Sequence, residues 1–93
     1  MMRTSVSRHA QARMQQRGIA ASAIECLLDF GRERHDHHGA VVVMLDRAAL
    51  RRVARTGAAR GATLDELRGL YAVVAPDGCV CTVGHRTRRL WNH

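Results

Sequence analysis

With 93 residues, a net charge of +7 and 46% apolar residues, the chain has the composition of a small, basic globular protein. A chain of this length buries one modest core, so we expect a single domain over residues 1–93. No apolar run approaches the roughly 20 residues that span a bilayer, and the N-terminus lacks the apolar stretch of about 7–15 residues found in a secretory signal. These features argue against a membrane or exported protein and favour a cytoplasmic one.

The net charge is confined to the two ends of the chain. Residues 1–19 carry four arginines and residues 79–93 carry three, without an acidic residue in either segment, whereas the eight arginines between them are matched by eight acids. If the fold brings the ends together, they form one basic patch, the usual electrostatic footprint of a nucleic-acid or phosphate partner. The chain has no lysine, and arginine binds phosphate bidentately, although a GC-rich genome also raises the arginine content.

Hydrophobic periodicity and turn residues predict the order of the elements. We expect helices over residues 8–17, 21–30 and 46–55, strands over 32–38 and 40–45, and a β-hairpin within 67–86, with a break at 57–62. The hairpin is the clearest signal, because Pro76, Asp77 and Gly78 favour a tight turn between two apolar runs. Helices that precede strands predict an α+β domain, in which a helical hairpin packs on a four-stranded antiparallel sheet.

The first helix carries the leading functional candidates. Ser7 is its expected N-cap, and Gly18 ends it. At 100° per residue, His9, Arg13 and Arg17 follow one edge of the helix, and this edge overlaps the apolar stripe. Charged residues that serve only solubility rarely occupy such a position, so this edge is a candidate phosphate site.

The last strand carries a second set of candidates. Strict alternation places Cys81 and His85 on one face and Val80 and Arg86 on the other, so only one of His85 and Arg86 can face a given site. The His85 face is expected to be the more buried one, where His85 can meet His9 under the helices, either as a catalytic pair or as a polar bridge. The three cysteines of the chain, an odd number, predict free thiols.

Two stretches of the sequence resemble a known family. SRHAQARMQQRGI resembles the S-x-H-A-x-x-R-M-x-x-R-G-I opening of a family of small bacterial proteins allied to the RelE/BrnT type of toxin, and TVGHRTRRLW is similar to the closing strand of that family. The resemblance implies a RelE/BrnT-like fold and an endoribonuclease, acting on the ribosome or free, that pairs with an antitoxin protein. Ala20 departs from the family, which often has a capping Ser or Thr at that position.

The resemblance and the residue chemistry together predict a toxin-like, metal-independent endoribonuclease without a cofactor. Cleavage by the RNA 2′-hydroxyl needs a group that accepts its proton, a group that protonates the leaving oxygen, and positive charge at the phosphate. We expect the catalytic residues to be His9, Arg13 and His85. We expect the nucleic-acid contacts to come from Arg17, Arg86, Arg88 and Arg89.

A binding module without chemistry is the main alternative. Such a small basic protein would dock on RNA, DNA or an acidic partner protein. In that case His9 bonds a backbone carbonyl, and Arg17 satisfies the carbonyls at the end of its helix. Arg88 and Arg89 then form a solvated basic tail. The sequence leaves the oligomeric state open.

A metal site is a further alternative for the segment His35-Asp36-His37-His38. His35 and His37 would share a strand face. A structural zinc site needs about four converging ligands, however, and the sequence offers no second ligand pair to complete it. We therefore expect an exposed hairpin here and no bound metal.

Overall fold

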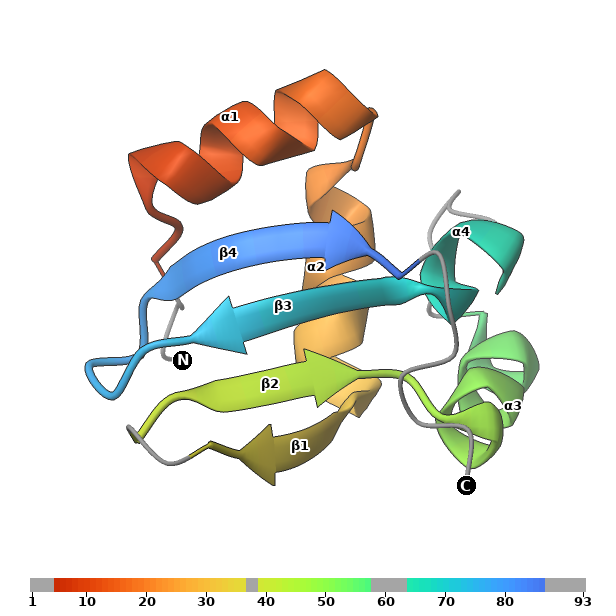
Figure 1. The fold of residues 1–93 in the computed structure, drawn as a ribbon. Helices are drawn as coiled ribbons and strands as arrows, with labels where there is room; N and C mark the ends of the chain where they lie inside the picture. The colour runs from red at the N-terminus through yellow and green to blue at the C-terminus, as the bar shows by residue number, and fades with distance from the viewer. Residues whose placement is uncertain (1–4, 37–38, 58–63, 87–93) are drawn as a thin grey trace.

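The computed structural model describes residues 5–36, 39–57 and 64–86, and they form an α+β fold (Figure 1). In chain order the elements are α1 (Arg8–Arg17), α2 (Ala21–Phe30), β1 (Arg32–His35), β2 (Val41–Met44), α3 (Arg47–Thr56), α4 (Leu64–Arg68), β3 (Leu70–Val74) and β4 (Val80–His85). The three predicted helices are confirmed, and the predicted turn at Pro76-Asp77-Gly78 joins β3 to β4. No helix among the described residues is long and apolar enough to cross a membrane.

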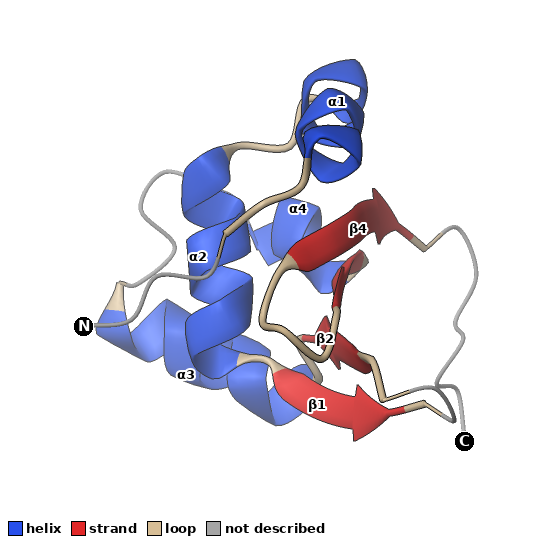
Figure 2. Cartoon of the chain, turned by 90° about the vertical axis from the view of Figure 1, so that its left-hand side faces the viewer, coloured by secondary structure: helices blue, strands red, loops and turns tan. Residues whose placement is uncertain are grey.

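The strands form one antiparallel sheet in the order β1-β2-β3-β4. Val43, Ala72 and Val83 lie in register across the three strands β2, β3 and β4, and all three are buried. The helix α2 packs against this face of the sheet, as Figure 2 shows. The predicted class, helices packed with a four-stranded antiparallel sheet, is therefore confirmed.

The helix α1 lies beside the edge strand β4 and not on the face of the sheet (Figures 1 and 2). It fully buries only one residue, Ala10, whereas α2 buries Ala23, Ile24, Cys26 and Leu27. A helix with so narrow an apolar stripe covers an edge more readily than a face. The prediction that both helices pack on the sheet face is therefore correct only for α2.

Hydrogen bonds tie the start of α1 to the start of β4. The Ser7 N–H donates to the Val80 carbonyl (2.9 Å), and the Val80 N–H donates to the Ser5 carbonyl (2.8 Å). As predicted, the Ser7 hydroxyl caps α1, accepting a hydrogen bond from the Ala10 N–H (3.1 Å). From this anchor α1 runs along β4 in the same direction (Figure 1).

A bulge in β4 interrupts the predicted alternation. The register of β4 against β3 shifts between Val73 and Val74, because Cys81 is an extra residue on β4. Val80 consequently lies fully buried in the core. The prediction that Val80 shares the outer face with Arg86 is therefore wrong. The extra residue at the bulge turns the Val80 side chain to the opposite face of the sheet. All three thiols are free, as predicted.

The short helix α4 was not predicted from the sequence. It begins at Leu64 and places Leu67 in the core, where Leu67 is fully buried. Asp65 and Glu66 lie in its first turn, where negative charge favours a helix. The first strand of the predicted hairpin therefore begins at Leu70 and not at residue 67. Most of the predicted break at 57–62 lies outside the described residues.

Candidate functional site

The structure does not bring His9 and His85 together. Ser7, two residues before His9, donates its hydroxyl hydrogen to the Cys81 carbonyl near the start of β4 (3.4 Å), whereas His85 ends β4. Since α1 and β4 run in the same direction and a ten-residue helix is about 15 Å long, His9 lies near one end of this pair and His85 near the other. The expected contact between these two histidines is therefore wrong.

The His9 edge of α1 is less buried than the helical angles predicted. The buried side is centred on Ala10, with Met14 packed against the core. His9 and Arg17 are exposed, and Arg13 is partly buried. The overlap predicted from the helical angles is thus too large, because a helix at the sheet edge buries only a narrow stripe.

Arg17 and His85 share a small pocket with Glu66. These side chains come from α1, β4 and α4 and line a space of about 190 Å³, together with apolar residues that include Ile19 and Leu70. An arginine, a carboxylate and a histidine in one pocket provide a fixed positive charge and two groups that exchange protons. We name this space the Arg17–His85 pocket; His9 and Arg13 do not line it.

His85 and Arg86 line different spaces, as the alternation at the end of β4 predicted. His85 pairs with the buried Leu70, and it lines the Arg17–His85 pocket. Arg86 follows β4 and lines a larger groove. His85 therefore contributes only to the Arg17–His85 pocket, and Arg86 only to the larger groove.

The larger groove lies where β2 passes into α3, and its volume is about 970 Å³. It is bordered by β1, α3, α4 and the residue after β4. The arginines that line it are Arg32, Arg34, Arg47, Arg51, Arg68 and Arg86. Glu33 and Asp46 are the carboxylates among its described lining residues, so positive charge predominates. We name it the arginine groove.

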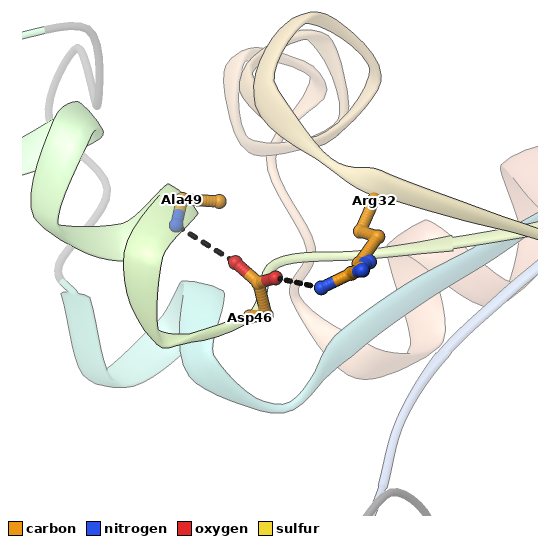
Figure 3. A network of polar contacts seen from close by, with 3 residues as sticks. All are labelled: Arg32, Asp46 and Ala49. Atoms are coloured by element: carbon orange, nitrogen blue, oxygen red, sulfur yellow. Dashed lines mark hydrogen bonds and ion pairs between the residues drawn. The ribbon is translucent and has the colours of Figure 1, made fainter.

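Asp46 fixes the position of Arg32 in the groove. One carboxylate oxygen of Asp46 accepts a hydrogen bond from the Ala49 N–H (2.8 Å), and the other accepts one from the Arg32 guanidinium (3.0 Å), as Figure 3 shows. The pKa of Asp46 is lowered, and the Ala49 hydrogen bond is the largest cause. The hydrogen bond and charge of Arg32 lower it further, whereas burial opposes these effects. The ionised carboxylate therefore holds a cation at the groove and caps α3 at once.

Arg47 and Arg51 in the groove lack such a partner in the described part of the chain. Arg47 and Arg51 lie one turn apart on α3, and within the described residues neither makes an ion pair. Like charges at this spacing destabilise a helix by about 0.2–0.5 kcal/mol. An anion bound in the groove would relieve this repulsion.

Arg86 is held by the main chain of its neighbours. Its N–H donates to the Gly69 carbonyl (2.8 Å), and its Nη2 lies 3.5 Å from the Arg68 carbonyl oxygen, a long distance for a hydrogen bond. Its Nε is buried and has no hydrogen-bond partner within the described part of the chain. A buried donor without an acceptor is costly, so the position of Arg86 carries an energetic cost in the fold.

No protein-family model, curated protein or solved structure matches this chain. The arginine groove and the Arg17–His85 pocket are therefore the observations from which a function is inferred. Residues distant in sequence build both, so neither depends on one short motif.

The arginine groove was not predicted from the sequence, because the middle of the chain is charge-balanced. Two signals nevertheless point to it. Arg47 and Arg51 are four residues apart on a helix, and Arg32 and Arg34 are two residues apart on a strand, so each pair shares a face. The sequence does not show that the α3 face with Arg47 and Arg51 lies near the β1 face with Arg32 and Arg34. That arrangement follows only from the packing of α3 beside the end of β2.

Other predicted site residues fall at exposed or undescribed positions. Arg88 and Arg89 lie outside the described residues, as do His37 and His38. His35 is exposed on β1. Among the residues that the structure describes, no group of three or more His, Cys, Asp or Glu side chains is arranged to hold a metal ion.

Proposed function

We propose that this protein binds RNA through the arginine groove. The observation that carries the proposal is the gathering of six arginines, from four parts of the fold, around one space with two carboxylates. Guanidinium groups bind phosphate bidentately, and a cleft lined by positive charge raises the local concentration of a polyanion. The phosphate backbone is therefore the ligand chemistry that the groove fits best.

The choice of RNA over DNA rests on the resemblance of residues 7–19 to the family allied to the RelE/BrnT toxins. A RelE/BrnT-like relationship of the whole fold belongs to the same proposal. The groove has no aromatic side chain among its described lining residues on which a base would stack. The proposed contact is consequently with the backbone and is independent of the RNA sequence.

Salt-dependent binding of a fluorescently labelled single-stranded RNA tests this proposal. Each phosphate that the protein neutralises contributes a slope of about −0.7 to the plot of log affinity against log salt concentration. Arg51→Gln removes one charge from the groove, and Arg55→Gln removes one from the same helix outside the groove lining. We expect Arg51→Gln to weaken binding severalfold and to reduce the slope by about 0.7, and Arg55→Gln to leave the slope unchanged. Equal effects of the two substitutions would contradict binding in the groove.

The Arg17–His85 pocket favours RNA cleavage as a second candidate function. In this reaction the 2′-oxygen attacks phosphorus and gives its proton to a base, and the 5′-oxygen leaves with a proton from an acid, which yields a 2′,3′-cyclic phosphate. Glu66 and His85 are the groups of the pocket that exchange protons, and Arg17 would stabilise the charge on phosphate. An antitoxin partner, acting on this activity, belongs to this second candidate.

Cleavage of labelled RNA in the presence of EDTA separates the two candidates. Loss of a general acid or base costs about 10²–10⁴-fold in rate, so we expect this loss for His85→Ala. The matched control is His9→Ala, which removes a histidine from the exposed far end of α1. Cleavage that required His9 and not His85 would contradict the pocket as the site. Groove-dependent binding without any cleavage by the wild type would contradict only the second candidate.

A further inference from the structure

The strand β1 is an open edge of the sheet. The opposite edge strand, β4, is covered by α1, whereas no described helix or strand lies beyond β1 (Figure 1). All four residues of β1 are exposed. An exposed edge is a template for a further strand, and its side chains select which strand is accepted.

The main-chain groups of Glu33 and His35 point away from the sheet. The Asp36 N–H donates to the Ala40 carbonyl (2.9 Å), and this pair continues the register of β1 with β2. Residues along an antiparallel pair alternate between bonded and non-bonded positions. The next residue bonded to β2 is therefore Arg34, and Glu33 and His35 direct their N–H and C=O groups outward.

The side chains of β1 separate their charges between the two faces. Glu33 is in register with the buried Val43 and lies on the helix side of the sheet. Arg32 and Arg34 lie on the other side, and all three residues border the arginine groove. A strand laid along β1 thus meets positive charge at two alternating positions on one face.

A second copy of β1 does not fit this edge. A second β1 can pair with the first in two antiparallel registers that keep the outward main-chain groups facing each other and overlap three residues. One register places Glu33 opposite Glu33 of the second copy, and the other places Arg34 opposite Arg34. Like charges directly opposite each other are destabilising. An acidic strand, in contrast, meets complementary charge at Arg34 and at Arg32, whose guanidinium also pairs with Asp46.

We propose that β1 binds an extended segment of a partner protein as a fifth antiparallel strand, with aspartate or glutamate at the two alternating positions opposite Arg32 and Arg34. The residue between these acids is neutral, because it lies opposite Glu33. Main-chain hydrogen bonds to Glu33 and His35 provide the affinity, and the alternating charge provides the selectivity. This inference stands without the proposed RNA binding, since the edge and its register do not depend on a nucleic acid.

Synthetic peptides test the strand addition on the unaltered protein. The probe is a fluorescent peptide that alternates glutamate with threonine, and its control alternates lysine with threonine. In the proposed register the threonine amides face β1 and the glutamate amides face away. We expect N-methylation of the threonine amides to weaken binding at least tenfold and N-methylation of the glutamate amides to leave it unchanged. Equal effects of the two methylation patterns, or equal binding of the lysine peptide, would overturn the proposal.

Variants of the edge provide a second measurement. His35→Pro removes an outward N–H, which an edge strand tolerates, and His35→Ala is its matched control. We expect only His35→Pro to weaken the glutamate peptide at least tenfold, while both variants bind labelled RNA equally. Arg34→Glu should reverse the preference towards the lysine peptide. Loss of RNA and peptide together in His35→Pro, with its circular dichroism spectrum unchanged, would mark the edge as a nucleic-acid surface and overturn the inference.

Discussion

Asp46 and Arg32 form an ion pair (3.0 Å) that joins the edge strand β1 to the first turn of α3. The same carboxylate accepts the Ala49 N–H as the N-cap of α3. One side chain therefore stabilises the helix that carries Arg47 and Arg51 and positions a third arginine of the arginine groove.

The two interactions of Asp46 are separable by substitution. Asp46→Ala removes the cap and the ion pair, and we expect it to lower the free energy of unfolding by about 0.5–2 kcal/mol. Asp46→Asn keeps the cap, and because the ion pair with Arg32 is exposed, we expect a cost of at most about 1 kcal/mol. Urea unfolding of both variants measures the difference. A loss for Asp46→Asn as large as that for Asp46→Ala would show that the cap contributes nothing.

The contribution of Asp46 depends on pH in a defined direction. The pKa of its carboxyl is lowered in the folded state, first by the Ala49 hydrogen bond and then by Arg32. The stabilisation is therefore fully present above the ordinary pKa of 3.8 and is lost as the pH falls through the lower pKa of the folded state. We expect the difference in unfolding free energy between wild type and Asp46→Ala to be constant between about pH 5 and pH 7 and to shrink below about pH 4. Urea unfolding at a series of pH values checks this, and a difference that grew towards acid pH would contradict it.

The core role of α4 is tested by its two leucines. Leu67 is fully buried, so we expect Leu67→Ala to cost about 2–5 kcal/mol. Leu64 lies one turn earlier in the same helix and is 38% exposed, so Leu64→Ala should stay within about 0.5 kcal/mol of the wild type. Thermal or urea unfolding of the pair is the measurement. Similar costs for both leucines would mean that α4 does not pack as described.

Gly31 permits the close approach of α2 to β2. A Cβ at this position would overlap the Leu27 carbonyl oxygen and the Val43 Cγ1 atom. We expect Gly31→Ala to cost about 1–3 kcal/mol through this overpacking. In a Val43→Ala background one of the two overlaps is absent, so the same substitution should cost less. An identical cost in both backgrounds, measured by urea unfolding, would exclude Val43 as a source of the strain.

Two of the three correctly predicted helices, α1 and α3, have strong end signals, whereas α2 begins at Ala20 without a side-chain cap. Ser7 and Gly18 bound α1, and Asp46 caps α3, because these residues satisfy or redirect the local main chain whatever the tertiary context. The helix α4 has five residues, too few to show a helical period. Its formation depends instead on the burial of Leu67 in the completed core.

The candidate site was predicted only where local geometry suffices. Beyond the bulge, the alternation of β4 correctly separates His85 from Arg86. The bulge at Cys81 and the placement of α1 at the sheet edge depend on cross-strand packing, which the sequence pattern does not contain. For the same reason the expected His9–His85 contact is wrong and the arginine groove was not foreseen.

The pairing of Val6 with Val80 has a consequence for the order of folding. The contacts that anchor α1 reach across 74 positions of the chain, from Ser7 to Cys81. During synthesis α1 is therefore made before β4, the strand that anchors it, and contacts of such long range are slow to form. Every other described element of the fold lies, in the sequence, between α1 and the strand on which it docks.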